Sequence, residues 1–335
     1  MWLTVLAALA VIFCALHLLW LRLTRPLISI TGRHVLITGG SQGLGKSLAE
    51  LCFRRGARVT IVARTAGKLQ QACDEIRQSA QGSEGRIQYL TLDVSSAKCE
   101  DINRLMQEAA ESFGRIDVFV SNAGSGNAAL LLETPLAEAE SLMEGQISVN
   151  LLGGLRSVIC AAQRMASDGK GGRISIVSSA AGLISLPGYA IYSATKFGHR
   201  GFLAGAYHEF LRYGVRLSVY YPGSIRTPGF AAEQEAVPRV TAKIEAQCSD
   251  ISSSEAAAEV LLNGILRGSH EITNELLPLL TLDMPTGCAP IDAAIAFLVQ
   301  LIRAGWFMYL KAMSSLYIEG RKPVSASASE PGKQE

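Results

Sequence analysis

Tyr192 and Lys196 are four residues apart in a segment with a helical pattern, which places both side chains on one face of a helix, one turn apart. An ammonium group stabilises a neighbouring phenolate, so the pair predicts a tyrosine pKa shifted from its reference of about 10 toward neutral pH. Such a phenol can act as a general acid for a carbonyl that becomes an alcohol. The alternative is an ordinary solvated pair, because this spacing is common on helices.

Further polar residues upstream distinguish a catalytic pair from a solvated one. Ser178 and Ser179 end an apolar run shortly before Tyr192, and Asn150 lies further upstream in Ser-Val-Asn. A glycine-rich turn occurs near the start of the chain. With the serine pair, Asn150 and the glycine-rich turn present in this order, the sequence favours a catalytic Tyr192 and Lys196 over a solvated pair.

The glycine-rich turn, Thr-Gly-Gly-Ser-Gln-Gly-Leu-Gly from Thr38 to Gly45, follows an apolar run and opens a helical pattern that continues through Phe53. Glycines at a strand-to-helix turn let a pyrophosphate approach the free N–H groups and the positive dipole end of the helix. An ordinary loop is the alternative reading of a glycine-rich turn taken alone. The predicted dinucleotide-binding residues of this turn are Gly39, Ser41, Gln42, Gly43 and Gly45.

The end of the second apolar run indicates which nicotinamide nucleotide is bound. NAD-binding sheets carry an acidic residue there, which accepts a hydrogen bond from a ribose hydroxyl. In this sequence the run ends at Arg64, Lys68 follows, and no carboxylate occurs before Asp74. Arg64 can bind a 2′-phosphate through charge-assisted hydrogen bonds, and Lys68 adds a point charge. The residues favour NADP(H) over NAD(H), with two solvated cations as the alternative.

Two further strand ends carry candidate cofactor contacts. Asp93 and Val94 end the third apolar run, where a carboxylate can accept from an adenine amino group. Asn122 begins Asn-Ala-Gly at the end of the fourth run, where small residues let the backbone pass beside a cofactor. Asn, Asp and Gly also favour turns, so either motif taken singly is equally well explained by turn chemistry.

The fold class follows from short β-branched runs that alternate with helical patterns. The runs are apolar without alternation, as expected when helices cover both faces of a sheet. This βαβ rhythm predicts an α/β fold with a Rossmann-type doubly wound parallel sheet, whose strands are 34–38, 58–63, 87–92, 118–121, 173–178 and 215–220.

In their order and spacing, these motifs resemble the short-chain dehydrogenase/reductase family over about residues 32–230. The resemblance implies that Ser179, which fits the family spacing better than Ser178, hydrogen-bonds the substrate carbonyl. It implies that Tyr192 donates the proton, and that Lys196 holds the nicotinamide ribose and lowers the tyrosine pKa. Asn150 would anchor a water of a proton relay through an irregularity in its helix.

The segment Pro-Gly-Ser-Ile-Arg-Thr at 222–227 also resembles a family motif. There the resemblance places the backbone near Ile225 against the carboxamide of the cofactor, and Thr227 near the phosphates. It further leaves a homo-oligomer open, because helices beside the catalytic tyrosine often form dimer faces in this family.

Within the family, the chain resembles the 3-ketodihydrosphingosine reductases through its apolar N-terminal segment, Tyr-Ser-Ala-Thr-Lys-Phe at 192–197, and Tyr221 leading to Phe230. This resemblance implies NADPH-dependent reduction of 3-ketosphinganine, a long-chain lipid ketone, to sphinganine. A membrane-associated enzyme for steroid, retinoid or fatty-acyl carbonyls remains the alternative. A catalytically silent nucleotide-binding protein would have a degraded Ser, Tyr and Lys set, whereas the set here is intact.

Composition excludes several other classes. The chain has 335 residues, is 49% hydrophobic and carries a formal net charge of +2, so it can form a packed core and has no excess of cations for nucleic acid. Its seven cysteines are scattered and contain no Cys-x-x-Cys pair. We therefore expect reduced thiols, no disulfide framework and no metal site.

The N-terminal segment is expected to anchor the protein in a membrane. Residues 1–21 contain no Asp, Glu, Lys or Arg, and about 20 apolar residues span a bilayer as a helix. A cleaved signal peptide is the alternative, but the basic start and the small-residue cleavage site are missing. Arg22 and Arg25 follow the segment, which predicts a catalytic domain on the cytosolic side. The family resemblance places the protein in the endoplasmic reticulum membrane.

The predicted organisation is an anchor at 1–25, an NADP(H)-binding domain at 32–270, an apolar membrane-associated region at 276–317 and a disordered tail at 322–335. The apolar region contains Asp292 and Arg303, which fit poorly in a lipid-exposed span. A re-entrant hairpin, an interfacial helix, two crossings and a buried lid helix all remain open for it.

Overall fold

The structure is a computed structural model that describes residues 28–248 and 251–274. The predicted anchor at 1–25, the apolar region at 276–317 and the tail at 322–335 lie outside the described residues. Among the residues that are described, no helix is long and apolar enough to cross a bilayer.

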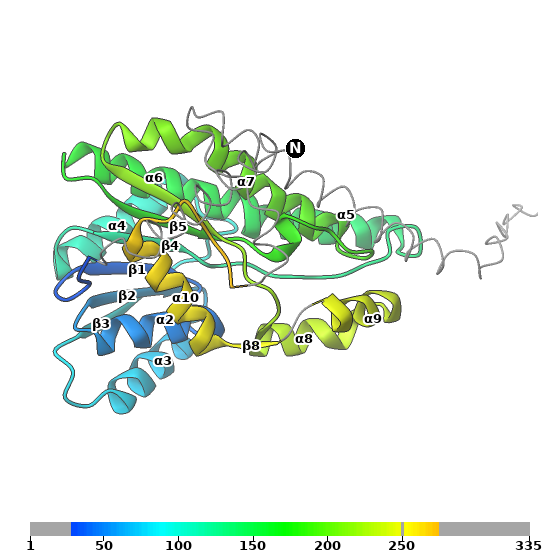
Figure 1. Cartoon of the computed structure of the whole chain (residues 1–335), viewed down its shortest axis with the longest axis horizontal. Helices are drawn as coiled ribbons and strands as arrows, with labels where there is room; N and C mark the ends of the chain where they lie inside the picture. The colour runs from blue at the N-terminus through cyan, green and yellow to red at the C-terminus, as the bar shows by residue number, and fades with distance from the viewer. Residues whose placement is uncertain (1–27, 249–250, 275–335) are drawn as a thin grey trace, which may run out of the picture. The chain divides into compact units, whose positions relative to one another are not determined.

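The central sheet has seven parallel strands in the described part of the chain, in the order β3-β2-β1-β4-β5-β6-β9 (Figure 1). The order of the first six is that of doubly wound dinucleotide-binding sheets, so the predicted fold class is confirmed. A short parallel pair, β7 (Ile225–Arg226) with β8 (Ser252–Ser253), lies outside this sheet. The strands of the main sheet are β1 (His34–Thr38), β2 (Arg58–Ala63), β3 (Arg86–Thr91), β4 (Val118–Ser121), β5 (Gly172–Val177), β6 (Val215–Tyr220) and β9 (Glu271–Ile272).

The predicted bounds of β1, β2, β4 and β6 are confirmed, whereas β3 and β5 each begin and end one residue earlier than predicted. In β3, Arg86 pairs with Arg58, and in β5, Gly172 pairs with Val215. The ladder with the neighbouring strand, rather than side-chain hydrophobicity, sets these bounds.

Helices cover both faces of the sheet, as the non-alternating strands predict. All five residues of β1 are buried: Val35 and Ile37 pack toward one helical layer, and Leu36 packs toward the other. Figure 1 shows the two layers on opposite sides of the sheet. One layer consists of α2 (Gly43–Arg54), α3 (Ala66–Ser79) and α10 (Ser254–Arg267), and the other of α4 (Cys99–Phe113), α6 (Gly154–Ser167) and α7 (Ala190–Leu211).

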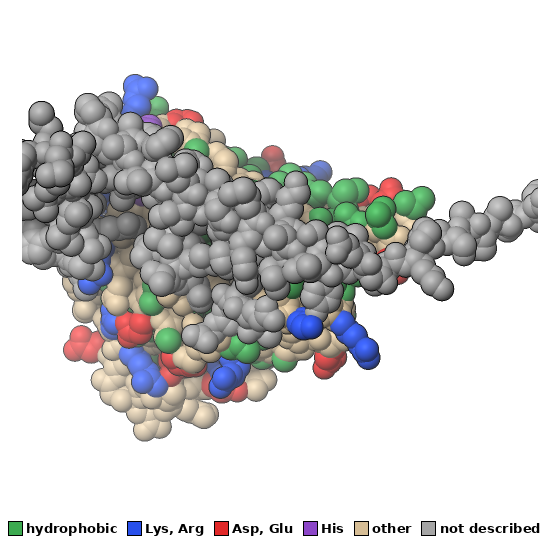
Figure 2. Space-filling model, turned by 45° about the vertical axis from the view of Figure 1, so that its right-hand side comes forward, with side chains coloured by type: hydrophobic (Ala, Val, Ile, Leu, Met, Phe, Trp, Pro, Cys, Tyr) green, Lys and Arg blue, Asp and Glu red, His purple; other side chains and the backbone are tan. Residues whose placement is uncertain are grey.

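The helix α5 (Leu136–Gln146) contributes little to the core, since Gln146 is its buried residue. Leu132, just before the helix, and Leu136, at its start, are 103% and 89% exposed. Figure 2 shows hydrophobic side chains gathered at the upper right of the molecule, the side on which Figure 1 places α5. The helix runs directly into a π-helical segment, η1 (Ile147–Gly153), which continues into α6.

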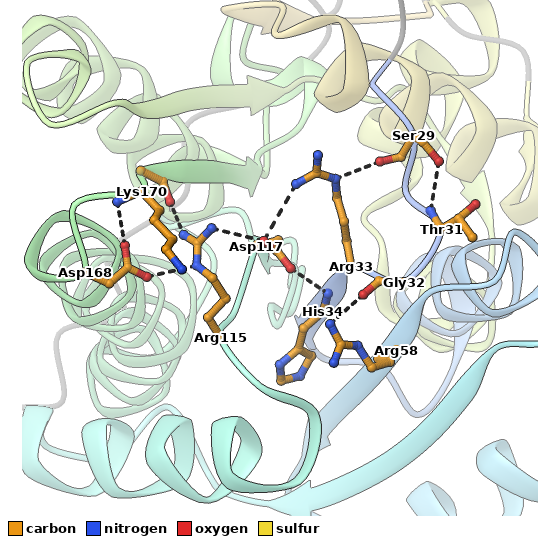
Figure 3. A network of polar contacts seen from close by, with 11 residues as sticks. Ser29, Thr31, Gly32, Arg33, His34, Arg58, Arg115, Asp117, Asp168 and Lys170 are labelled. Atoms are coloured by element: carbon orange, nitrogen blue, oxygen red, sulfur yellow. Dashed lines mark hydrogen bonds and ion pairs between the residues drawn. The ribbon is translucent and has the colours of Figure 1, made fainter.

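A network of polar contacts holds the amino-terminal edge of the sheet (Figure 3). Asp117, just before β4, accepts a hydrogen bond from the backbone N of His34 at 2.9 Å and pairs with Arg115 at 3.1 Å and with Arg33 at 3.7 Å. Arg115 also pairs with Asp168, before β5, at 2.9 Å. The network joins the starts of three strands, so the opposite, carboxyl edge of the sheet is where a ligand can bind.

Candidate active site

The catalytic candidates meet at the carboxyl edge of the sheet. Tyr192 and Lys196 lie on the first turns of α7, and the ammonium of Lys196 is 5.5 Å from the centre of the Tyr192 ring. Lys196 is buried and donates to the carbonyl of Val177, the last residue of β5, at 3.1 Å. The structure therefore brings the predicted pair together and ties its lysine to the end of a central strand.

The two serines after β5 have different contacts. The hydroxyl of Ser178 is buried and donates to the carbonyl of Lys196 at 3.0 Å, which holds α7 against the strand end. The Ser179 hydroxyl accepts from the backbone N of Ala181 at 3.1 Å, at the start of a short 3₁₀ helix, η2 (Ala180–Gly182), and hydrogen-bonds Tyr192. The structure therefore places Ser179, and not Ser178, beside the tyrosine hydroxyl, as the sequence predicts.

The predicted lowering of the Tyr192 pKa is wrong for this site. Burial raises the pKa of Tyr192 far above its usual value, the carboxylate of Glu233 raises it further, and the hydrogen bond with Ser179 lowers it only in part. Burial also lowers the pKa of Lys196 to about 8, because the ammonium is removed from water. The phenol thus stays protonated at neutral pH, which is the form that a general acid for ketone reduction requires.

Asn150 lies in the middle of η1, so the predicted helix irregularity is present. Its side-chain amide is held on both sides: the oxygen accepts from Ser125 N at 2.8 Å, and the nitrogen donates to Ser125 O at 2.9 Å and to Thr195 Oγ1 at 3.2 Å. Ser125 belongs to the loop after β4, and Thr195 to α7. Asn150 therefore connects two parts of the site that are far apart in the sequence.

His199 is a residue of this site that the sequence reasoning missed. Its Nε2 donates to the backbone carbonyl of Asn150 at 2.8 Å, which requires the tautomer with the proton on Nε2. Burial and the nearby Lys196 lower the pKa of His199 to about 3, so the ring is neutral. The sequence did contain a signal for His199. It lies three residues after Lys196, which places both side chains on the same face of the helix.

We expect His199 to make the free energy of unfolding fall in acid. Its folded-state pKa, about 3, is below the usual 6.5, so the unfolded state binds more protons between these values. Stability is then complete above pH 6.5 and falls as the pH decreases, by about 2 kcal/mol at pH 5. Urea unfolding of the detergent-solubilised chain at pH 5 and pH 7.5 measures this difference.

The variant His199→Gln should lose most of that pH dependence, because its amide can still donate to Asn150 but does not titrate. His208→Asn, at an exposed position of the same helix, is the matched control and should leave the pH dependence unchanged. Equal pH dependence in wild type and His199→Gln would contradict the assignment.

The glycine-rich turn between β1 and α2 has the close packing that its sequence predicts. Gly39 and Gly43 have φ values of 67° and 54°, in the left-handed region that favours glycine. A Cβ on Gly45 would overlap the carbonyl oxygen of Gly39 and lie 2.5 Å from Nδ2 of Asn122. Asn122 in turn donates to the carbonyls of Thr38 and Gly39 at 3.0 Å each. The hydrogen bonds from Asn122, directly after β4, therefore hold the turn in place.

This turn fits a pyrophosphate. Gln42 is the N-cap residue of α2 but its side chain makes no capping hydrogen bond, so it does not occupy the N–H groups of the first turn. Ser41 precedes it in the same turn. A Cβ on Gly43 would lie 2.9 Å from the Thr227 side chain, so the segment that includes Ile225 in β7 closes over the turn. The structure thus brings the glycine turn and the 222–227 segment together.

The remaining cofactor candidates lie along the ends of β2 and β3. Arg64 and Lys68 are exposed, and neither forms an ion pair with another described residue, so both can take an external anion. Asp93 accepts from the N and Oγ of Ser95 at 3.0 and 2.7 Å, which is the turn chemistry that the sequence left open. Val94 is buried, and its carbonyl packs against the π-helical segment η1 at Gly153.

Glu233 is a second residue that the sequence reasoning missed. It lies on α8 (Pro228–Ala236), which follows the 222–227 segment, and its carboxylate accepts a hydrogen bond from Tyr189, just before α7. Burial raises the pKa of Glu233, while the positive charge of Lys196 lowers it in part. No sequence signal linked Glu233 to Tyr192, because the two are distant in the chain and share no motif.

Comparison with known proteins agrees with this geometry. Residues 33–238 match the family model described as short chain dehydrogenase. The chain is 32% identical over 303 residues to a 3-dehydrosphinganine reductase of Danio rerio, with 88% of each chain covered. It is 30% identical over 297 residues to a 3-ketodihydrosphingosine reductase of Bos taurus, with 86% of each covered.

Solved structures show the same fold. Levodione reductase superposes with a TM-score of 0.64 at 23% identity, covering 73% of this chain and 97% of that one. A short chain dehydrogenase/reductase from Burkholderia phymatum, solved in complex with NAD, superposes with a TM-score of 0.63 at 23% identity and covers 74% and 90%. From its family match, its relatives and its fold, this chain belongs to the short-chain dehydrogenase family of oxidoreductases.

Proposed function

We propose that the chain reduces 3-ketosphinganine to sphinganine with NADPH. The observation that supports this proposal most directly is the joint placement of Ser179, Tyr192 and Lys196 at the carboxyl edge of the sheet, the edge at which the glycine turn follows β1. The substrate comes from the relatives, which are named 3-dehydrosphinganine and 3-ketodihydrosphingosine reductases and are similar over most of the chain.

Each residue has a role that the family resemblance implies and that its position in the site supports. NADPH, when bound, supplies the hydride for the carbonyl carbon. Ser179 and Tyr192 hydrogen-bond the carbonyl oxygen, and Tyr192, protonated at neutral pH, gives that oxygen its proton. Lys196 holds the nicotinamide ribose, and its ammonium supports the phenolate that remains. The family resemblance assigns Asn150, which the hydrogen bond to Thr195 holds beside α7, the role of anchoring a water of the proton relay.

The test is a substrate panel. The full chain, purified in detergent, is mixed with NADPH and with a set of lipid, steroid and retinoid ketones, and cofactor oxidation is followed by absorbance. We expect kcat/KM to be highest for 3-ketosphinganine. A higher kcat/KM for a steroid or retinoid ketone would contradict the proposed substrate. The proposal that the chain is a ketone reductase would still stand.

Arg64 and Lys68 are proposed to select NADPH by binding its 2′-phosphate. Both side chains are exposed, Arg64 directly after β2 and Lys68 in the first turn of α3, and no acidic residue is available there for a free ribose hydroxyl. We expect Arg64→Ala to lower kcat/KM for NADPH about tenfold to a hundredfold and to change that for NADH little. Because salt screens exposed charges, the wild-type preference should shrink with ionic strength.

Steady-state kinetics with both cofactors measures this preference. Arg104→Ala, an exposed arginine on α4 with 78% of its side chain accessible, is the matched control and should leave the NADPH to NADH ratio unchanged. An unchanged ratio in Arg64→Ala would remove the basis for proposing NADPH over NADH.

We also propose that the protein resides in the endoplasmic reticulum membrane with its catalytic domain in the cytosol. The support is the uncharged stretch at 1–21 followed by arginines, together with a lipid substrate. Protease added to sealed microsomes should cut near Gln234 without detergent while a lumenal marker stays intact. Protection of this region until detergent is added would place the domain in the lumen.

A further inference from the structure

The carboxylate of Glu233 lies inside the active site without a cationic side chain to pair with. It accepts a hydrogen bond from Tyr189, a residue that is 5% exposed and whose ring centre is 5.7 Å from that of Tyr192. Among the described residues, no Lys or Arg forms an ion pair with Glu233, and Lys196 is the cation whose charge acts on it. A half-buried carboxylate that has a hydrogen bond but no ion pair gains stability from a ligand that brings a positive charge.

The position of this carboxylate relative to the catalytic residues is set by the loop after β4. A Cβ on Gly126 would lie 2.6 Å from an oxygen of Glu233, so the carboxylate packs directly against that loop. Two residues earlier, a Cβ on Gly124 would lie 3.0 Å from the Asn150 side chain and 3.6 Å from the Lys196 ammonium. One short stretch of backbone thus separates Glu233 from the catalytic set.

A second carboxylate adds to the negative potential. Glu245, on α9 (Arg239–Cys248), raises the pKa of Glu233 and that of Tyr192 by its charge. Its oxygens accept from Ser224 and Gln234 at 3.0 Å each, donors that satisfy it without neutralising it. The space next to Tyr192 therefore favours a cation on the substrate.

The substrate in the proposed function has such a cation in the required place. 3-Ketosphinganine is an α-amino ketone: its amine, protonated at neutral pH as α-amino groups are, lies on the carbon next to the carbonyl. When Ser179 and Tyr192 bind the carbonyl oxygen, the amine is held close to the same hydroxyl. The charge of Glu233 acts on that hydroxyl, so it also acts on an ammonium held beside the hydroxyl.

We propose that Glu233 is a specificity-determining residue that binds the substrate ammonium, so that this enzyme selects α-amino ketones over simple long-chain ketones. The inference rests on the proposed function and assigns a part of it to one residue. The contact would orient the carbonyl on Ser179 and Tyr192 as well as select the substrate.

The experiment compares 3-ketosphinganine with its analogue that lacks the amine, 1-hydroxyoctadecan-3-one, in wild type and in Glu233→Gln. The variant is nearly isosteric, and its amide oxygen can still accept from Tyr189. Wild type should prefer the amino ketone, and Glu233→Gln should lower kcat/KM for it about tenfold to a hundredfold. Any effect of the variant on the Tyr192 pKa acts on the reduction of both substrates, so the analogue measures that effect separately. We expect kcat/KM for the analogue to change far less than kcat/KM for the amino ketone.

Glu235→Gln, at an exposed position of the same helix, is the matched control and should behave as wild type. Unchanged NADPH binding, followed by cofactor fluorescence, shows that each variant is folded. An equal loss for both substrates in Glu233→Gln, or equal use of both ketones by wild type, would overturn the role of Glu233 while the reductase activity stands. Failure of wild type to reduce either ketone would overturn the proposed function and this inference together.

Discussion

Replacement of Tyr192 by phenylalanine is expected to lower kcat by about a hundred- to ten-thousandfold, the usual contribution of a general acid. The ring is retained, so its packing against Tyr189, with ring centres 5.7 Å apart, is preserved. Lys196 keeps its hydrogen bond to Val177 in the variant, because that bond does not involve the phenol. The loss should therefore appear in turnover, with NADPH affinity close to that of wild type.

Single-turnover kinetics and cofactor fluorescence separate these two quantities for Tyr192→Phe. Tyr213→Phe, in a tyrosine that is 58% exposed, removes a hydroxyl outside the site and should leave both quantities unchanged. Near-normal turnover in Tyr192→Phe would mean that another group supplies the proton, and the assignment of the active site would fail.

Replacement of Gly45 by alanine is expected to abolish most NADPH binding. The added methyl group would overlap the backbone carbonyl of Gly39 and lie 2.5 Å from the Asn122 amide, which hydrogen bonds to Thr38 and Gly39 hold in place. The turn and the end of β4 must then separate, at a cost of about 1–3 kcal/mol in folding free energy. Because the pyrophosphate depends on that same backbone, we expect Kd for NADPH to rise by more than about tenfold.

Gly205→Ala is the matched control, since a Cβ at this exposed position of α7 meets nothing within 4 Å. It should leave NADPH affinity unchanged and stabilise the helix by up to about 1 kcal/mol. Titration of cofactor fluorescence measures Kd, and thermal unfolding measures stability. Wild-type affinity in Gly45→Ala would show that the turn does not hold the phosphates.

Much of this protein was predictable because its motifs are local. The bounds of β1, β2, β4 and β6 follow from buried β-branched runs, and the glycine turn between β1 and α2 follows from residues that are consecutive in the chain. The pairing of Tyr192 with Lys196 is equally local, because one helical turn separates them. In each case, the periodicity of a single element or the geometry of a single turn is enough to predict the local structure.

What only the tertiary structure decided involves residues that are distant in sequence. Burial and the Glu233 carboxylate raise the Tyr192 pKa more than the hydrogen bond with Ser179 lowers it. No local sequence pattern predicts the burial of Tyr192 or its proximity to a carboxylate on α8. His199 acquires its role only when α7 packs against the π-helical segment that contains Asn150. The sequence by itself determined which elements form and which residue types could do chemistry, whereas packing between elements determined the charges that those residues experience.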